Sequence, residues 1–238
     1  MKVIAEIFSA EFWSTYGALL MKETWSTLVM LLISTFFAYL IGLPLGVLLT
    51  LTGKNGIRPC KPVNQVLGWI INVGRSLPFI ILMCSITDFT RAIVGTYIGV
   101  RGAIVPLVVS AAPFVARMVE SSLSEVDGGV VEAAQSMGAS PLQIVCKVYL
   151  PEAVPSLVLG GSISIITILA YTAIAGAIGA GGLGDLALRY GYQRKIASVN
   201  LVTIILLIVL VQIIQTVFSR LSTRIDKRIT KENPDKKS

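Results

Sequence analysis

The chain has 238 residues, of which 54% are apolar and only 14% are charged, and its mean hydropathy is +0.79. This composition excludes an ordinary soluble domain, in which about 25% of the residues are charged. The formal net charge of +7 does not indicate nucleic-acid binding, because no aromatic interleaving or nucleic-acid-binding motif accompanies it. Histidine is absent, which excludes histidine-based metal sites, nucleophilic triads and proton relays. The three cysteines have no paired spacing, so they predict neither a disulfide nor a metal site.

Long apolar stretches predict an all-α polytopic membrane protein with about five transmembrane helices. A helix needs about 20 residues to cross the hydrocarbon core of a bilayer, and residues 24–53 contain no charge at all. We predict spans at residues 24–52, 63–87, 96–118, 156–177 and 197–219. The chain then divides into an amino-terminal interfacial segment (1–23), a transmembrane domain (24–219) with a polar loop at 119–155, and a basic tail (220–238).

Basic residues predict the orientation, because loops rich in lysine and arginine stay in the cytoplasm. With the amino terminus outside, the cytoplasmic side holds twelve basic residues: Lys54, Arg58, Lys61, Arg117, Lys147, Arg220, Arg224, Lys227, Arg228, Lys231, Lys236 and Lys237. The outer side holds seven: Lys2, Lys22, Arg91, Arg101, Arg189, Arg194 and Lys195. We therefore expect the amino terminus outside, the carboxyl terminus in the cytoplasm beside anionic membrane lipid, and the loop at 119–155 in the cytoplasm.

This polar loop is predicted to hold two short helices around a tight turn. Asp127 can cap the first helix, and Gly138 can end it in the left-handed conformation that glycine adopts at little cost. Four apolar residues are expected on one side of this helix: Val126, Val130, Ala134 and Met137.

The second helix has its own start and stop signals. Ser140 and Gln143 fit a capping box, and Pro141 fits the first helical position. Pro151 and Pro155 are expected to close this helix and to start the next span. Periodicity alone leaves two interpretations open, a surface hairpin without a partner and a docking element.

A sequence pattern in this loop favours docking. Glu132-Ala133-Ala134, followed by Gly138 and then Leu150-Pro151, resembles the EAA loop of bacterial ABC importer permeases. In that family the loop is a coupling helix that sits in a cleft of the cytoplasmic ATPase. The resemblance implies that Glu132, Ala133, Ala134 and Gly138 dock on an ATPase.

Three further segments, at 75–82, 112–120 and 179–184, narrow the resemblance to the methionine-importer permease branch. The similarity covers about residues 24–228 and implies the type I ABC importer permease fold, with cytoplasmic coupling helices, in a bacterial cytoplasmic (inner) membrane. It also implies a homodimer, a cytoplasmic ABC ATPase dimer that uses ATP and Mg, and an extracytoplasmic substrate-binding lipoprotein. No cofactor is expected on this chain. An importer for another small solute, such as another amino acid or a phosphonate, is the alternative.

A nucleotide-binding protein, an enzyme and an ion-coupled secondary carrier are all disfavoured, because the residues or the context that each would need are absent. The glycines Gly179-x-Gly181-x-x-Gly184 match a dinucleotide-binding fingerprint, but they follow a membrane span instead of a strand. They are expected to form a flexible or closely packed outer turn, or an outer gate element. The sequence has no Gly-x-x-x-x-Gly-Lys-Ser/Thr loop and no nucleophile–base pair, so an enzyme is not expected. An ion-coupled secondary carrier would need buried acidic residues, and the predicted spans contain no central Asp or Glu.

Small and hydroxylated residues recur along the fourth span at helical spacing: Gly160, Ser164, Thr167 and Tyr171. Two interpretations fit them, close helix packing and lining of a translocation pathway. Arg75 is the only charge in the second predicted span. We expect it to cap carbonyl groups or to pair with a carboxylate.

Overall fold

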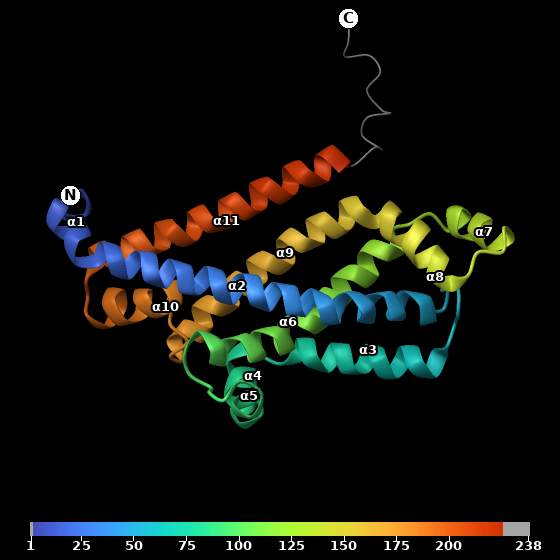
Figure 1. Cartoon of the computed structure of the whole chain (residues 1–238), viewed down its shortest axis with the longest axis horizontal. Coiled ribbons are helices and arrows are strands. Elements are labelled where there is room, and N and C mark those ends of the chain that lie inside the picture. The colour runs from blue at the N-terminus through green and yellow to red at the C-terminus, as the bar shows by residue number, and fades with distance from the viewer. Residues whose placement is uncertain (1, 226–238) are drawn as a thin grey trace, which may run out of the picture. The chain divides into compact units, whose positions relative to one another are not determined.

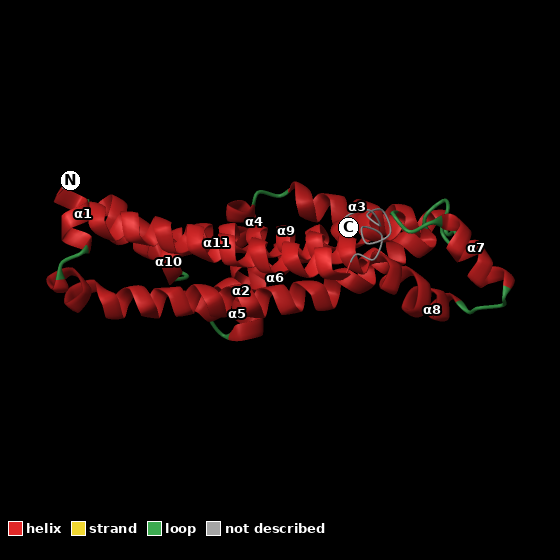
Figure 2. Cartoon of the chain, turned by 90° about the horizontal axis from the view of Figure 1, so that it is seen from above, coloured by secondary structure: helices red, strands yellow, loops and turns green. Residues whose placement is uncertain are grey.

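The computed structural model describes residues 2–225, which form helices, turns and loops and contain no strand (Figures 1 and 2). Five of the seven basic residues of the predicted tail, from Lys227 to Lys237, lie outside the described residues. The helices are α1 (Lys2–Ile7), α2 (Ala10–Thr52), α3 (Lys61–Ser76), α4 (Phe79–Ser85), α5 (Thr87–Val94), α6 (Gly99–Ser124), α7 (Gly128–Ser136), α8 (Pro141–Ile144), η1 (Val145–Tyr149), α9 (Leu150–Ala177), α10 (Gly182–Leu186), η2 (Ala187–Gln193) and α11 (Ala197–Ile225). The segments η1 and η2 are π-helical.

Four helical stretches within residues 2–225 are long and apolar enough to cross a membrane: Ala10–Thr52, Gly99–Ser124, Pro141–Ala177 and Ala197–Ile225. A fifth span arises only if the bent pair α3 and α4 is counted as one. The predicted continuous helix at 63–87 is therefore broken. Pro78 explains the break, because proline has no backbone N–H and disfavours the helical conformation of the residue before it, here Leu77.

Helix α2 begins much earlier than the predicted first span. It starts at Ala10 and has 43 residues, about twice the number that a span needs. The proposed interfacial segment at 1–23 is thus divided between α1 and the first turns of α2.

The chain forms two compact units, to each of which α2, α6, α9 and α11 contribute a part. The first unit comprises residues 1–38, 77–111 and 165–213. One of its two apolar clusters joins α2, α4, α6 and α9 through Met30, Phe79, Met83, Leu107 and Ala175. In the other, Phe12 and Leu20 of α2 pack with Leu183, Leu186 and Val199, so α1, α10 and the beginning of α11 gather around the first half of α2 (Figure 1).

The second unit comprises residues 39–76, 112–164 and 214–238. Its core contains Leu49, Ile71 and Ala116, from α2, α3 and α6. Helices α2 and α6 approach closely at two glycines four residues apart. A Cβ atom at Gly42 would lie 2.7 Å from the Val115 side chain, and one at Gly46 would lie 2.5 Å from the Ala116 carbonyl oxygen. Small residues of this spacing allow membrane helices to pack backbone against backbone.

Candidate functional site

The polar loop folds into the two capped helices that its sequence predicts, at one end of the second unit (Figures 1 and 2). Asp127 caps α7, and its Oδ1 accepts a hydrogen bond from the Gly129 N–H at 2.8 Å. Gly138 follows α7 with φ of 80°, and its N–H donates to the Gln135 carbonyl at 2.9 Å. Positive φ is strained for residues that have a Cβ atom, so the glycine ends the helix cheaply.

The start of α8 is also confirmed. The Ser140 N–H donates to Gln143 Oε1 at 2.8 Å and the Gln143 N–H donates to Ser140 Oγ at 3.4 Å, which completes the capping box. The predicted end of this helix is wrong. The chain remains helical from Pro141 to Ala177. The wider π-helical turn at Val145–Tyr149 precedes Pro151, which could not donate a regular helical hydrogen bond.

We call residues 127–144, which comprise α7, the turn and α8, the coupling element. Its inner face consists of buried Val131, Ala134 and Ile144. Its outer face exposes two large apolar side chains, Met137 at 82% and Leu142 at 74%. The four apolar residues expected on one side of α7 do not share one environment, because Ala134 is buried whereas Val130 and Met137 are exposed.

The four predicted docking residues thus separate by exposure. Glu132, Ala133 and Gly138 are exposed, whereas Ala134 is buried against the rest of the second unit. The prediction of docking residues did not include Met137 and Leu142. Large apolar side chains in a polar loop are the sequence signal that could have identified them. An outer face with large apolar groups and no intramolecular cover is typical of a protein–protein contact.

The four residues of the fourth predicted span lie in α9 with different surroundings. Gly160 and Ser164 are buried in the second unit. A Cβ atom at Gly160 would lie 2.9 Å from Met118 Cε, and the Ser164 hydroxyl donates to the Gly160 carbonyl at 2.9 Å. For these two residues the contacts are those of close helix packing. In the first unit Thr167 is half-buried, and the ring of Tyr171 stacks on Phe79 with centroids 4.8 Å apart.

The glycine-rich segment forms a tight loop in the first unit, which we call the glycine loop (residues 179–184). Gly179, Gly181 and Gly182 all have positive φ. A Cβ atom at Gly184 would lie 2.3 Å from the Ala173 carbonyl oxygen, so the loop packs directly on α9. This close packing is the first of the two interpretations of the motif, and a gate remains a proposal.

An ion pair follows the glycine loop. The Arg189 guanidinium donates to the Asp185 carboxylate one helical turn earlier. This hydrogen bond is the main reason why the pKa of Arg189 is raised above its usual value.

The family model of the binding-protein-dependent transport system inner membrane component matches residues 42–231. The chain belongs to this family. It is a membrane permease component of a transport system, and its fold is that of its relatives.

Three similar proteins are all named for methionine transport. The probable D-methionine transport system permease protein MetI of Vibrio cholerae serotype O1 is 49% identical over 219 residues, which cover 92% of this chain and 97% of the relative. The D-methionine transport system permease protein MetI of Escherichia coli K12 is 50% identical over 158 residues, covering 66% and 73%. A solved structure titled as inward-facing conformations of the MetNI methionine ABC transporter matches with a TM-score of 0.88 and 46% identity, over 90% of this chain and 99% of that one.

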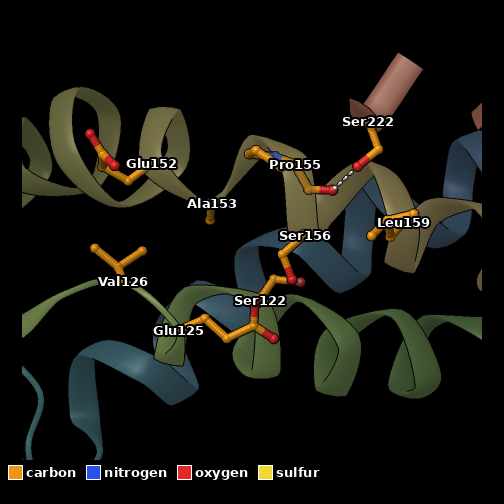
Figure 3. Close-up of a pocket in the computed structure, with 9 residues that line it drawn as sticks. All are labelled: Ser122, Glu125, Val126, Glu152, Ala153, Pro155, Ser156, Leu159 and Ser222. Carbon is orange, nitrogen blue, oxygen red and sulfur yellow. Dashed lines mark hydrogen bonds between the residues drawn. The ribbon is translucent and has the colours of Figure 1, made fainter. Parts of the chain in front are cut away.

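Two cavities of the permease lie in the second unit. One of about 620 Å³ borders the coupling element, and Glu132 and Gln135 line it together with Lys54 and Glu120. The other, of about 270 Å³, lies among α6, α9 and α11 (Figure 3). There the Ser222 hydroxyl donates to the Pro155 carbonyl at 3.0 Å, which satisfies a carbonyl in the proline-containing part of α9.

Arg75 of the permease lies in the last turn of α3, where the predicted second span breaks. Its side chain is exposed, and among the residues that the structure describes it has no ion-pair or hydrogen-bond partner. The expected pairing with a carboxylate or a capped carbonyl is therefore absent there. Arg117 of α6, in contrast, forms polar contacts in the second unit. It pairs with Glu120 and donates to Asn72 Oδ1 of α3 at 3.0 Å.

Proposed function

We propose that this permease is the membrane-spanning subunit of an ATP-driven importer for methionine. The observation that carries the transport role is the coupling element, a rigidly capped pair of helices with Met137 and Leu142 exposed on its outer face. The proposed substrate rests on relatives that are named as methionine transporters and align with most of the chain.

The proposed transporter contains a second copy of this permease, an ATPase dimer and a substrate-binding lipoprotein. Four or five spans from one chain enclose a pathway poorly, so a second copy forms the other wall, and lipid covers the remaining apolar faces. A cytoplasmic ATPase dimer binds ATP and Mg, and a substrate-binding lipoprotein delivers methionine from outside. Closure of the ATPase dimer moves the coupling elements, which turns the pathway outward, and ATP hydrolysis resets it. The short capped helices transmit this displacement without melting.

Docking through the coupling element is testable with the purified complex. Met137→Asp places a charge on the exposed apolar face and should weaken ATPase binding by about 2 kcal/mol, roughly thirtyfold, because a buried unpaired carboxylate is costly. Ser121→Asp, at an exposed serine of α6 outside the coupling element, is the matched control. Co-purification of the ATPase with each variant measures the effect. Equal recovery of the ATPase with both variants would contradict the proposed docking face.

The substrate is tested by uptake of labelled L- and D-methionine in cells that lack the gene and in the same cells with the gene restored. Uptake that returns with the gene and is blocked by excess methionine, but not by phosphonates or other amino acids, supports the proposal. Inhibition by another solute at lower concentration would transfer the assignment to an importer for that solute.

In α9, we propose Thr167 and Tyr171 as the stronger pathway candidates, because both are only partly buried and carry a hydroxyl group, whereas Gly160 and Ser164 are buried. Tyr171→Phe keeps the ring that stacks on Phe79 but removes a hydroxyl group. A hydroxyl that contacts the zwitterion should raise the KM for uptake about tenfold when it is lost, whereas a packing residue should leave the KM unchanged.

A further inference from the structure

A carboxylate of α2 is buried against the glycine loop in the first unit. Glu23 is only 6% exposed, and its Oε2 accepts a hydrogen bond from the Gly182 N–H at 2.6 Å. One turn later Thr27, at 1% exposure, accepts a hydrogen bond from the Leu183 N–H at 2.8 Å. The Thr27 hydroxyl donates in turn to the Glu23 carbonyl at 3.0 Å, which fixes its orientation. Two consecutive N–H groups of the loop are thus held by two side chains of one helix.

The loop and the helix fit so closely that only glycine is accommodated at the contact. Gly182 has φ of 83°, and a Cβ atom there would lie 2.7 Å from Thr27 Oγ1 and 2.9 Å from Met30 Cε. The loop also contributes an apolar residue to each core cluster of the first unit, Ala180 to the cluster that contains Met30 and Leu183 to the cluster that contains Leu20.

A carboxyl group is a costly choice at such a position. Burial of an unpaired acid is strongly unfavourable, and an apolar side chain would fill the space without that cost. Glu23 keeps the Gly182 N–H as its hydrogen-bond donor only while the loop stays in this position. If the loop moved away, the buried Glu23 carboxylate would lose its backbone donor, which is costly. Partly displaced positions of the loop are therefore disfavoured.

We propose that Glu23 and Thr27 form a clamp that positions the glycine loop in the closed arrangement of the outer side, and that this clamp releases when the pathway opens outward. This inference rests on the proposed function. The chain resembles a transporter solved in inward-facing conformations, and an inward-facing importer is closed on its outer side. The seated loop therefore belongs to the closed state, and the clamp biases the transporter toward it.

The release is measurable by thiol labelling in the assembled transporter, in proteoliposomes with ATPase and binding protein. Cys60, Cys84 and Cys146 are replaced by serine, and Ala180→Cys, at 2% exposure within the clamped loop, reports release to a membrane-impermeant maleimide. Ala103→Cys, which is fully buried in the same apolar cluster, reports general loosening.

We expect Glu23→Ala and Thr27→Val to raise the labelling rate at residue 180 by roughly tenfold, because each removes a buried hydrogen-bond acceptor and leaves its donor unpaired. Labelling at residue 103 should stay unchanged, and ATP hydrolysis without binding protein should rise. Thr27→Ser retains the acceptor and should restore slow labelling. Glu11→Ala, at an exposed acid of the same helix, is the matched control.

Two results would overturn the clamp. One is unchanged labelling at residue 180 in Glu23→Ala, and the other is an equal rise at residues 180 and 103, which would indicate a structural role only. Neither result depends on the substrate, because labelling is measured without methionine. Failure of methionine uptake by the wild-type complex would instead contradict the proposed substrate and leave the labelling comparison valid.

Discussion

Gly138 shows how one residue sets the geometry of the coupling element. No atom lies within 4 Å of the position that its Cβ would occupy, so a substitution there is opposed by the backbone and not by crowding. With φ of 80°, Gly138→Ala should destabilise the turn by about 1–2 kcal/mol. Gly138→Asn should cost less, because asparagine tolerates this conformation.

Gly128 is the matched control for this prediction. It is also exposed and has no atom within 4 Å of a Cβ position, but its φ is not positive. Gly128→Ala should therefore be neutral or stabilising by up to about 1 kcal/mol. Hydrogen exchange of the amides at 128–144 measures both changes, and equal protection in the two alanine variants would contradict the assigned role of φ.

Local signals in the sequence predicted the residue-scale features well, whereas contacts between distant segments were missed. Asp127, Gly138 and the Ser140–Gln143 box act on neighbours within a few residues, and the structure confirms all of them. Glu23 is the last residue of the predicted interfacial segment and has no predicted role, because its partner, Gly182, is 159 residues away. No periodicity or capping rule connects two residues at that separation.

At the scale of elements, α2 and α6 pack backbone against backbone at Gly42 and Gly46. Gly46→Ala would place a Cβ 2.5 Å from a backbone oxygen of Ala116 and 2.6 Å from the Val119 Cβ. Because a backbone atom cannot rotate away, the helices must separate, and we expect a loss of about 1–3 kcal/mol. Thermal unfolding of the purified permease should show a clear fall in Tm.

A glycine in α3 separates this packing effect from helix propensity. Gly68 lies in α3, and no atom lies within 4 Å of a Cβ built there. Gly68→Ala should leave Tm unchanged or raise it slightly, because alanine favours helix by about 1 kcal/mol over glycine. If both variants lowered Tm equally, the close approach of α2 and α6 would not explain the loss.

Element boundaries were predicted less well than element types, because the effect of a proline on a helix differs from one position to another. Pro78 breaks the second predicted span, whereas Pro151 and Pro155 are accommodated inside one continuous helix. The difference is the surroundings of each proline. A π-helical turn precedes Pro151, so the helix is wider where this proline cannot donate a regular hydrogen bond. A rule that ends every helix at a proline does not include this local change of helix geometry.

At the scale of the whole molecule, the proposed transport direction requires the coupling element inside and the segment after the glycine loop outside. The predicted orientation rests on the excess of basic residues on the cytoplasmic side, and the structure supplies reporters for both sides. Cys146 is an exposed native cysteine in η1, directly after the coupling element. Tyr192, 77% exposed in η2, can be replaced by cysteine as a reporter in the segment that is predicted to lie outside.

With Cys60 and Cys84 replaced by serine, an impermeant maleimide should label Cys146 in inside-out vesicles and not in right-side-out vesicles. Tyr192→Cys, in a chain that also has Cys146→Ser, should show the reverse pattern. The contrast should be at least about tenfold, because a charged reagent crosses the hydrocarbon core very slowly. Labelling of Cys146 from outside would invert the topology. The coupling element would then lie away from cytoplasmic ATP, and an ATPase could not dock on it.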